Sequence, residues 1–560
     1  MGRRGSGAGS RPPAPTLPPL KPGYLQPDMI PKQKRELTRR DRLTDGSTMD
    51  EETFKLCSWV SRVTCIFLPG AFRCATAVAL GAPLVPAPVA GSAPRRPNVL
   101  FLAADDLRTD LGCYGSAEAR TPHIDALARQ GVVFERAYCQ QAVCNPSRAS
   151  LLTGRRPDTI KVWDLRRHFR ETLPDVVTLP QYFKQHGYTA IGIGKLFHNE
   201  SGGKPPFPFA DPVSWSEPPV FAEGPHWRDW VVPGDPSGPK SKGGAVQCLE
   251  VADEAYLDGR IAAAAVTRLG DLARTRQPFF LGVGFWKPHL PFNAPKKYWD
   301  LYARAKISTP VPVRMPEGAP AIAGHAWNEL RGYAGVPKEG PLPPAQIAEL
   351  RHGYLACISF LDAQVGRVLA ELARLDLAKY TIVVLWGDNG FHLGEHDLWG
   401  KTTNYELDTR VPLIVVAPGV TRAGGRAAGP TELLGLYPTL VELCGLAAAP
   451  GVEGRSLLPQ LRDPRQPGAD VAVSQHPHPS YGRATHMGYS VRTARHRYVE
   501  WRDLATGAVT NRELYDHEAD PAETYNRVAD PEQSAIMKDL ESRAARFVAA
   551  GGRGWMERAR

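Results

Sequence analysis

The chain has 560 residues, enough for one large domain with a smaller one, or for three of modest size. Hydrophobic residues make up 42% and charged residues 22%, a balance typical of a soluble globular protein with a sizeable core. With 68 basic and 58 acidic residues the formal net charge is +10, which suits an anionic partner. Composition leaves open whether that partner is nucleic acid, a membrane surface, or a sulfated or phosphorylated substrate.

Cysteine usage argues against two frameworks common in small domains. The nine cysteines include no CxxC pair and no His/Cys cluster at zinc spacing, which excludes the usual structural zinc sites. Three of them lie near the N-terminus, and the other six are scattered singly. This pattern indicates individual buried thiols rather than a disulfide framework, although an exported protein would accommodate one or two bridges.

Residues 1–94 are predicted to be an extension outside the folded domain. Residues 1–50 are rich in Gly, Pro, Arg and Lys without a sustained apolar period, which is typical of disorder. Residues 54–93 are apolar, and their small residues near Ala90 resemble a secretory cleavage stretch, so we expect an exported protein, periplasmic or extracellular. A disordered Ala/Pro linker is the alternative. Several prolines and Arg73 argue against a stable membrane span.

The folded part begins with a short apolar run at 99–103, of the kind buried on both faces of a sheet. Similar strands are expected at 189–195, 278–286, 380–390 and 411–419, and helices at 178–187, at 253–274 and from 347 onward. Strands that alternate with helices predict an α/β domain with a largely parallel sheet, which we place at 95–450.

A smaller α+β subdomain is predicted at 451–560. Residues 487–503 and 509–517 have the pattern of antiparallel strands around a turn at Thr506 and Gly507. A closing helix is expected over 531–549. The sequence contains no internal repeat.

Two acidic pairs follow predicted strands. Asp105 and Asp106 end the first strand, and Asp388 with Asn389 ends the strand at 380–390. Ligands of open α/β sheets bind at the carboxyl edge of the strands, where these four side chains should meet. Adjacent carboxylates repel unless a cation lies between them, and hard oxygen donors favour Ca²⁺ or Mg²⁺. Either pair alone is more typical of a turn or cap, but two pairs at one edge favour a metal site.

The segment "VCNPSRASLLTGRRPD" places a cysteine at the entrance of a short helix. Asn145 suits the N-cap, Pro146 the first helical position and Gly154 the stop, so Cys144 is expected just before the helix. Backbone N–H groups there favour an anion, and Arg148 is close enough to contact the same spot. A packed thiol and a reactive thiolate are both alternatives, and neither accounts for the surrounding pattern.

That pattern resembles the type I sulfatase signature, Cys-x-Pro-Ser-Arg followed by Leu-Thr-Gly-Arg. "DDLRTDLGCYG", "GKLFH", "WKPHLPF" and "LGEHDLWGKTTNYE" extend the resemblance over 98–526, and it is strongest to the iduronate-2-sulfatase branch. The resemblance implies an alkaline phosphatase-like fold, with a large, mostly parallel mixed sheet sandwiched by helices. It also implies that a formylglycine-generating enzyme oxidises Cys144 to formylglycine.

The resemblance further implies a role for each matching residue. One calcium ion would be held by Asp105, Asp106, Asp388, Asn389 and the modified Cys144. Arg148 would stabilise the aldehyde hydrate, and Lys195, His198, His289 and Lys401 would surround the sulfate, with His289 protonating the leaving group. Taken alone, a lysine that ends a strand is usually solvated and a histidine beside proline is usually a loop residue. His392 and His396 would position their loop or support other site residues.

The implied activity is hydrolysis of a sulfate ester of a sugar or uronate, with no nucleic-acid partner and no stable membrane insertion. The chain departs from the lysosomal iduronate sulfatases at Asn389, where they carry histidine, so iduronate itself is less strongly implied. A phosphatase or phosphonate monoester hydrolase of the same superfamily is one alternative. A carbohydrate-binding relative without activity is another, but it would have lost Cys144, Arg148 or the aspartates, and all are present.

Overall fold

The computed structural model describes residues 96–198, 203–204, 207–208, 210–221, 242–275, 277–480 and 483–551. The predicted extension and its signal-like segment therefore lie outside the described residues. Within the described ranges, no helix is both long and apolar enough to cross a membrane. The cysteines in these ranges are all free thiols: Cys113, Cys139, Cys144, Cys248, Cys357 and Cys444.

A seven-stranded mixed sheet forms the centre of the fold. Its order from edge to edge is β17 (Gly425–Ala427), β2 (Val132–Phe134), β16 (Leu413–Val416), β12 (Thr381–Gly387), β1 (Asn98–Asp105), β9 (Phe279–Pro288) and β4 (Thr189–Gly194). The strands β12, β1, β9 and β4 run parallel to one another, and only β16 is antiparallel to its neighbours. The predicted, mostly parallel sheet is thus confirmed.

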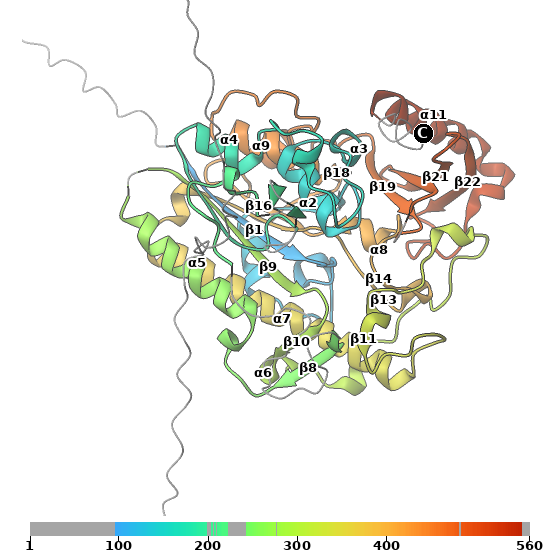
Figure 1. The fold of residues 1–560 in the computed structure, drawn as a ribbon, viewed down its shortest axis with the longest axis horizontal. Helices are drawn as coiled ribbons and strands as arrows, with labels where there is room; N and C mark the ends of the chain where they lie inside the picture. Colours follow the sequence, from blue (N-terminus) through green and yellow to red (C-terminus); the bar gives the residue numbers. More distant parts are fainter. Residues whose placement is uncertain are drawn as a thin grey trace, which may run out of the picture. The chain divides into compact units, whose positions relative to one another are not determined.

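Helices cover both faces of this sheet (Figure 1). Leu100 and Leu102 of β1 belong to a core shared with α1 (Pro122–Gln130), α5 (Leu257–Ala273) and α7 (Pro344–Arg374). Val99 and Phe101 point to the other core, which contains residues of α2 (Cys144–Thr153), α4 (Leu179–Gln185) and α9 (Leu436–Leu443). Because side chains alternate along a strand, an all-apolar β1 is what a sheet buried on both faces requires.

Local sequence signals explain most element boundaries. Thr178 caps α4 by accepting from the Gln181 backbone N–H, and the Gln181 side chain accepts from the Thr178 N–H in return, a capping box that contributes about 1 kcal/mol. The strand expected at 411–419 is instead two short strands, β15 (Arg410–Val411) and β16, on either side of Pro412. Proline has no N–H to donate to a sheet ladder, so the interruption falls at that residue.

The C-terminal region contains a four-stranded antiparallel sheet. Its strands are β19 (Ala472–His478), β20 (His486–Arg492), β21 (His496–Asp503) and β22 (Val509–Asp516), and α11 (Ser534–Gly551) packs against it. The turn after β21 contains Gly507 at φ 75°, as expected for its predicted position. Sequence patterns missed β19, the edge strand β17 and its neighbour β2. The division into 95–450 and 451–560 stays a prediction.

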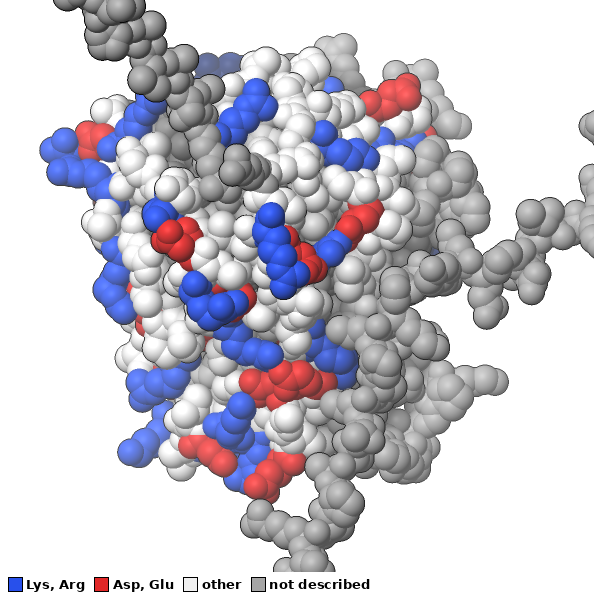
Figure 2. Space-filling view, turned by 90° about the vertical axis from the view of Figure 1, so that its left-hand side faces the viewer, with Lys and Arg blue, Asp and Glu red and all other residues white. Residues whose placement is uncertain are grey.

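Basic and acidic side chains are interspersed on the face shown in Figure 2. Neither sign forms a continuous block there. The excess of basic residues is therefore distributed on this face, as the scattered arginines of the sequence suggest.

Candidate active site

Four strand ends bring the predicted polar residues to one edge of the sheet. Asp105 is the last residue of β1, and Asp388 directly follows β12, whose Gly387 lies beside Ala104 in the parallel register. Lys195 follows β4, and His289 follows β9. Parallel strands end at a common edge, so residues far apart in sequence meet there.

The three aspartates of this edge form a buried acidic cluster. Asp105, Asp106 and Asp388 are fully buried, and one oxygen of each lies within 4.8 Å of the others. The Asp106 backbone N–H donates to Asp388 Oδ1 at 3.0 Å, and Asp106 has φ 59°, in the left-handed region. Strained backbone of this kind concentrates at functional sites.

Each aspartate contacts at least one cationic side chain. Lys195 Nζ lies 2.5 Å from Asp105 Oδ2, and Arg148 Nε lies 2.6 Å from Asp388 Oδ2. Lys401 Nζ lies 2.7 and 2.6 Å from the two oxygens of Asp106. Arg148 also donates to Asp105 and to two backbone carbonyls after β4, so its guanidinium is fixed by the cluster.

The carboxylates nevertheless differ in their pKa values. Burial alone would raise the pKa of Asp105, but Lys195 and nearby cations hold it well below its ordinary value. Burial, with repulsion from the neighbouring acids, raises the pKa of Asp106 well above its ordinary value despite Lys401, and the pKa of Asp388 is also raised. The cluster is therefore short of positive charge, which a bound divalent cation would supply.

The donor set of the cluster fits a calcium ion. Asn389 Oδ1 is buried and accepts no hydrogen bond from any described residue, while Asn389 Nδ2 donates to Asp106 Oδ1 at 2.8 Å. A buried oxygen that accepts no hydrogen bond from the described residues, next to three carboxylates, is available to coordinate a cation. Carboxylate and amide oxygens are the ligands that Ca²⁺ prefers. Asp105, Asp106, Asp388 and Asn389 are thus the residues that would hold it.

The structure corrects the expected start of the helix at Cys144. The helix α2 begins at Cys144 itself, after an extended Val143, and ends at Gly154 with φ 67°. Asn145 does not cap the helix, because its side chain donates instead to the backbone carbonyls of Asp164 and Arg167, both at 2.8 Å. Cys144 is therefore the first helical residue rather than the residue before the helix.

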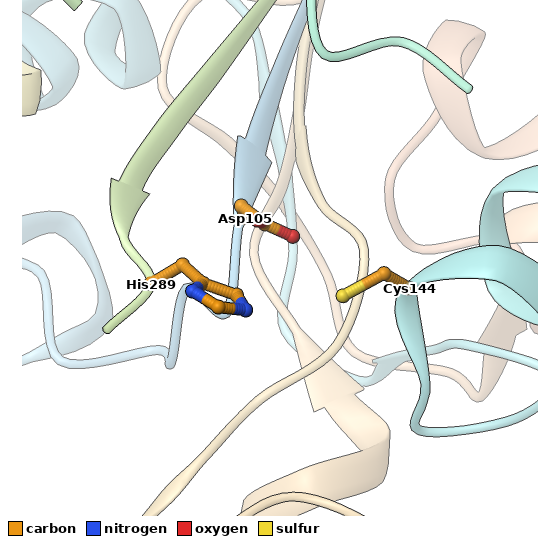
Figure 3. Close-up of side chains that lie close together, drawn as sticks. All are labelled: Asp105, Cys144 and His289. Atoms are coloured by element: carbon orange, nitrogen blue, oxygen red, sulfur yellow. The ribbon is translucent and has the colours of Figure 1, made fainter. Parts of the chain in front are cut away.

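The Cys144 sulfur faces the acidic edge (Figure 3). Sγ lies 4.0 Å from Asp106 Oδ1, and one ligating atom each of Asp105, Cys144 and His289 lies within 4.8 Å of the others. Burial and the charge of Asp105 raise the pKa of the thiol well above its ordinary value. An unmodified Cys144 is thus held as a thiol, which disfavours the interpretation as a reactive thiolate.

The two predicted histidines approach the cluster from different loops. Burial and the charge of Lys195 lower the pKa of His198, which lies four residues after β4. His289 Nδ1 lies 2.6 Å from the Leu290 carbonyl oxygen, and Nε2 lies 3.7 Å from Asp106 Oδ2. Burial and the positive charge of Lys401 also lower the pKa of His289. A proton on Nε2 is therefore stabilised only by the oxygen acceptors that lie near that nitrogen.

One acidic residue near the cluster was missed in the sequence. Glu329 Oε1 lies 3.2 Å from His289 Nε2, and Glu329 Oε2 lies 3.5 Å from Lys401 Nζ. It comes from a long irregular segment between α6 (Lys296–Trp299) and α7, where no strand end or motif marks it.

A second missed residue, Asp408, holds the turn that carries Lys401. Its Oδ2 accepts from the Thr403 backbone N–H at 3.0 Å and from the Thr403 hydroxyl at 2.6 Å, and its Oδ1 lies 2.6 Å from His392 Nδ1. The neighbouring Thr402 has φ 89°, which is strained for a β-branched residue. The contacts of Asp408 therefore stabilise a costly backbone conformation beside Lys401, with support from His392.

Comparison with known proteins decides the family. A family model described as "Sulfatase" matches residues 97–446, and a second, "N-sulphoglucosamine sulphohydrolase, C-terminal", matches 394–549. The chain belongs to the sulfatase family. It is 33% identical to the iduronate 2-sulfatase of Homo sapiens over 518 residues, which cover 79% of this chain and 93% of that protein. The predicted family, its iduronate-2-sulfatase branch and a sulfuric ester hydrolase activity are confirmed.

Solved structures of similar proteins confirm the fold. The phosphonate monoester hydrolase SpPMH from Silicibacter pomeroyi superposes with a TM-score of 0.66 at 25% identity, covering 81% of this sulfatase and 96% of that chain. BT4656, solved with its substrate D-glucosamine-2-N,6-O-disulfate, gives 0.64 at 20% identity, covering 83% and 99%. At that identity the second likeness concerns the fold alone, and the alkaline phosphatase-like prediction is confirmed.

Proposed function

We propose that this sulfatase is calcium-dependent, that its Cys144 is converted to formylglycine by a formylglycine-generating enzyme, and that it removes sulfate from a sulfated sugar or uronate. The observation that carries the proposal is the position of Cys144 Sγ. It lies against an acidic cluster that is short of positive charge and is flanked by Arg148, Lys195 and Lys401.

The two absent groups would supply a nucleophilic hydroxyl, from the aldehyde hydrate, and a Lewis acid beside it. The chain's own residues explain the rest of the reaction. Lys195 and Lys401 place positive charge where the sulfate oxygens gain negative charge in the transition state. His289 delivers a proton to the departing alkoxide, and His198 accepts one when sulfate is released. Arg148 orients the side chain of residue 144 through its fixed guanidinium.

A sulfated carbohydrate is the substrate class that the comparisons favour. The human relative is named for its action on iduronate 2-sulfate, and BT4656 was solved with a sulfated glucosamine. The net positive charge of the chain suits a polyanionic glycan. Residues 54–93 motivate an exported location, which stays a prediction because they lie outside the described residues.

Hydrolysis of a phosphonate monoester is the second candidate, because SpPMH shares the fold at 25% identity. A direct test compares sulfate release from sulfated uronate and glucosamine sugars with hydrolysis of a phenyl phosphonate monoester. The enzyme is co-expressed with a formylglycine-generating enzyme. We expect the sulfated sugars to be turned over with the higher kcat/KM. Hydrolysis of the phosphonate alone would replace the proposal with the second candidate.

Loss of the nucleophile precursor provides the matched control. Cys144→Ser should leave no sulfate release, whereas Cys248→Ser should behave as the wild type, because Cys248 is exposed and remote in sequence from every site residue. Full activity of Cys144→Ser would show that residue 144 does not act through formylglycine.

A further inference from the structure

Glu329 is the acid of the site that lies closest to solvent. Its side chain is 17% exposed, while those of Asp105, Asp106 and Asp388 are 0% exposed. It stands two residues after Trp327, which has φ 53° and is therefore strained for an aromatic residue. The strained backbone at Trp327 costs stability, so other contacts must hold this segment in place. Such strain is typical of functional sites.

The contacts of His289 define which nitrogen faces the reaction. A backbone carbonyl can only accept, so the 2.6 Å contact with Leu290 places a hydrogen on Nδ1. Nε2 then points toward Glu329 Oε1 at 3.2 Å and Asp106 Oδ2 at 3.7 Å. Both ring nitrogens of His289 lie near oxygen acceptors, so the Leu290 carbonyl and the Glu329 carboxylate together fix the orientation of the ring.

The same carboxylate also contacts a group expected to bind sulfate. Glu329 Oε2 lies 3.5 Å from Lys401 Nζ, whose other contacts are the two oxygens of Asp106. Glu329 thereby sets the distance between His289 Nε2 and Lys401 Nζ. His289 would face the bridging oxygen of the sulfate ester, and Lys401 would face its non-bridging oxygens. Errors of about 1 Å in such positions cost about 100-fold in rate.

We propose that Glu329 is a positioning residue that orients His289 Nε2 and Lys401 Nζ toward one sulfate ester, so that the site is built for alkyl sulfates such as those of sugars. The inference rests on the proposed sulfatase function. In the step concerned, the nucleophile at residue 144 bonds to sulfur while the bond from sulfur to the sugar oxygen breaks, and the electron pair of the broken bond stays on the sugar oxygen. Because Nδ1 keeps its hydrogen on the Leu290 carbonyl, His289 acts as the doubly protonated imidazolium. Its Nε2 proton moves to the sugar oxygen, the ring becomes neutral and the alcohol leaves.

The nature of the leaving group gives the proposal a specific signature. An alkoxide is a poor leaving group and needs the proton, whereas a nitrophenolate leaves without much assistance. Removing Glu329 should therefore damage hydrolysis of a sulfated sugar far more than hydrolysis of 4-nitrophenyl sulfate. A merely structural role would damage both reactions equally.

The experiment measures kcat and KM of the wild type, Glu329→Gln and Glu329→Ala on both substrates, with Asn328→Ala as the matched control. Asn328 is the exposed neighbour of Glu329 in the same segment. We expect Glu329→Ala to lower kcat on the sulfated sugar by about 100-fold and on the aryl sulfate by less than about 5-fold. The isosteric Glu329→Gln variant should show the same bias, and it covers the case in which the alanine variant fails to fold.

Two further readouts separate the possible results. Calcium affinity by titration calorimetry and formylglycine content by mass spectrometry should stay unchanged in both variants. Equal losses on the two substrates, or no loss, would overturn the role of Glu329 while leaving the sulfatase function intact. A wild type that releases sulfate from neither substrate would instead refute the proposed function, and the inference with it.

Discussion

The protein contains two buried charge clusters that differ in how well their charges balance. At the sheet edge, burial and mutual repulsion raise the pKa values of Asp106 and Asp388. Where the C-terminal sheet meets the loop after Lys401, Arg497 contacts Glu523 at 2.6 Å and also Glu406. Burial opposes ionisation there too, but Arg492 and Arg497 hold the pKa of Glu406 well below its ordinary value, and Arg497 lowers that of Glu523 to about 2.

This difference distinguishes a structural cluster from one whose donors suit a bound cation. In the C-terminal cluster every carboxylate is matched or outnumbered by arginine, and Arg497 also donates to the Asn404 carbonyl at 2.6 Å. At the sheet edge, the four acids Asp105, Asp106, Asp388 and Glu329 face the three cations Arg148, Lys195 and Lys401. Asn389 Oδ1 there has no hydrogen-bond partner among the described residues. Loss of the C-terminal cluster should therefore affect folding, and loss of the sheet-edge cluster should affect catalysis.

The largest expected effect is on activity at the sheet edge. Asp106→Asn removes a proposed calcium ligand and the partner of Lys401, so we expect sulfate release to fall by at least about 1,000-fold. The midpoint of thermal unfolding should not fall, because the substitution relieves repulsion among buried acids. A strong loss of stability in calorimetry would show that the cluster is structural.

The C-terminal cluster should respond in the opposite way. Arg497→Ala leaves Glu523 buried without its main cation and removes one of the arginines that contact Glu406, which should cost about 3–5 kcal/mol in the free energy of unfolding. Chemical denaturation of the variant and the wild type measures the loss. A matched control is Arg495→Ala, because the side chain of Arg495 is 48% exposed and its ion pair with Asp516 should contribute less than about 1 kcal/mol.

Calcium should stabilise the first cluster specifically. At a concentration 100 times its Kd, the ion should add about 2.7 kcal/mol to the free energy of unfolding. A chelator should reverse the effect, and Asp106→Asn should abolish it, whereas Arg497→Ala should keep it. Equal stabilisation of wild type and Asp106→Asn would place the ion elsewhere.

Asp408 should have a smaller effect that acts through Lys401. Asp408→Asn weakens the contacts with Thr403 and His392 that hold the strained turn at Thr402. We expect kcat to fall by about 10-fold, with calcium affinity unchanged. Thr403→Val, which removes only the hydroxyl contact, should give a milder loss, and kinetics identical to the wild type in both variants would exclude the positioning role.

The smallest effect concerns Glu513 of the C-terminal sheet, which forms no ion pair with the described residues. Glu513 accepts from Trp501 and Tyr515, and burial raises its pKa to about 7. A raised pKa means that the folded state binds the proton more tightly, so its contribution to stability grows as the pH falls from about 7 toward 4.5. Glu513→Gln should flatten this dependence by on the order of 1 kcal/mol in denaturation at pH 5 and 7.

The sequence predicted those parts of the site that depend on strand ends. Asp105 and Asp388 interrupt apolar runs abruptly, and a parallel sheet brings such interruptions together, so their meeting followed from topology. Lys195 and His289 were found through the family motif, and the structure places both at the same edge. Pro412 itself indicates the break between β15 and β16, but the apolar residues on either side of it favoured one continuous strand.

What the sequence did not predict depends on contacts between distant segments. Glu329 lies in a loop with no regular pattern, and its importance appears only when that loop lies against His289 and Lys401. The helix α2 begins one residue earlier than expected, at Cys144, because the Asn145 side chain donates to carbonyls 19 and 22 residues away and does not cap its own helix. The edge strand β17 and its neighbour β2 have three residues each, too few for a periodic signal.

Residue 144 is proposed to act as formylglycine, and mass spectrometry of the peptide 143–155 tests this proposal. Protein purified from its native host, with its sulfatase activity recorded, is digested and the mass of this peptide is measured. We expect an aldehyde in place of the Cys144 thiol. An unmodified thiol in a preparation that hydrolyses sulfate esters at full rate would contradict it.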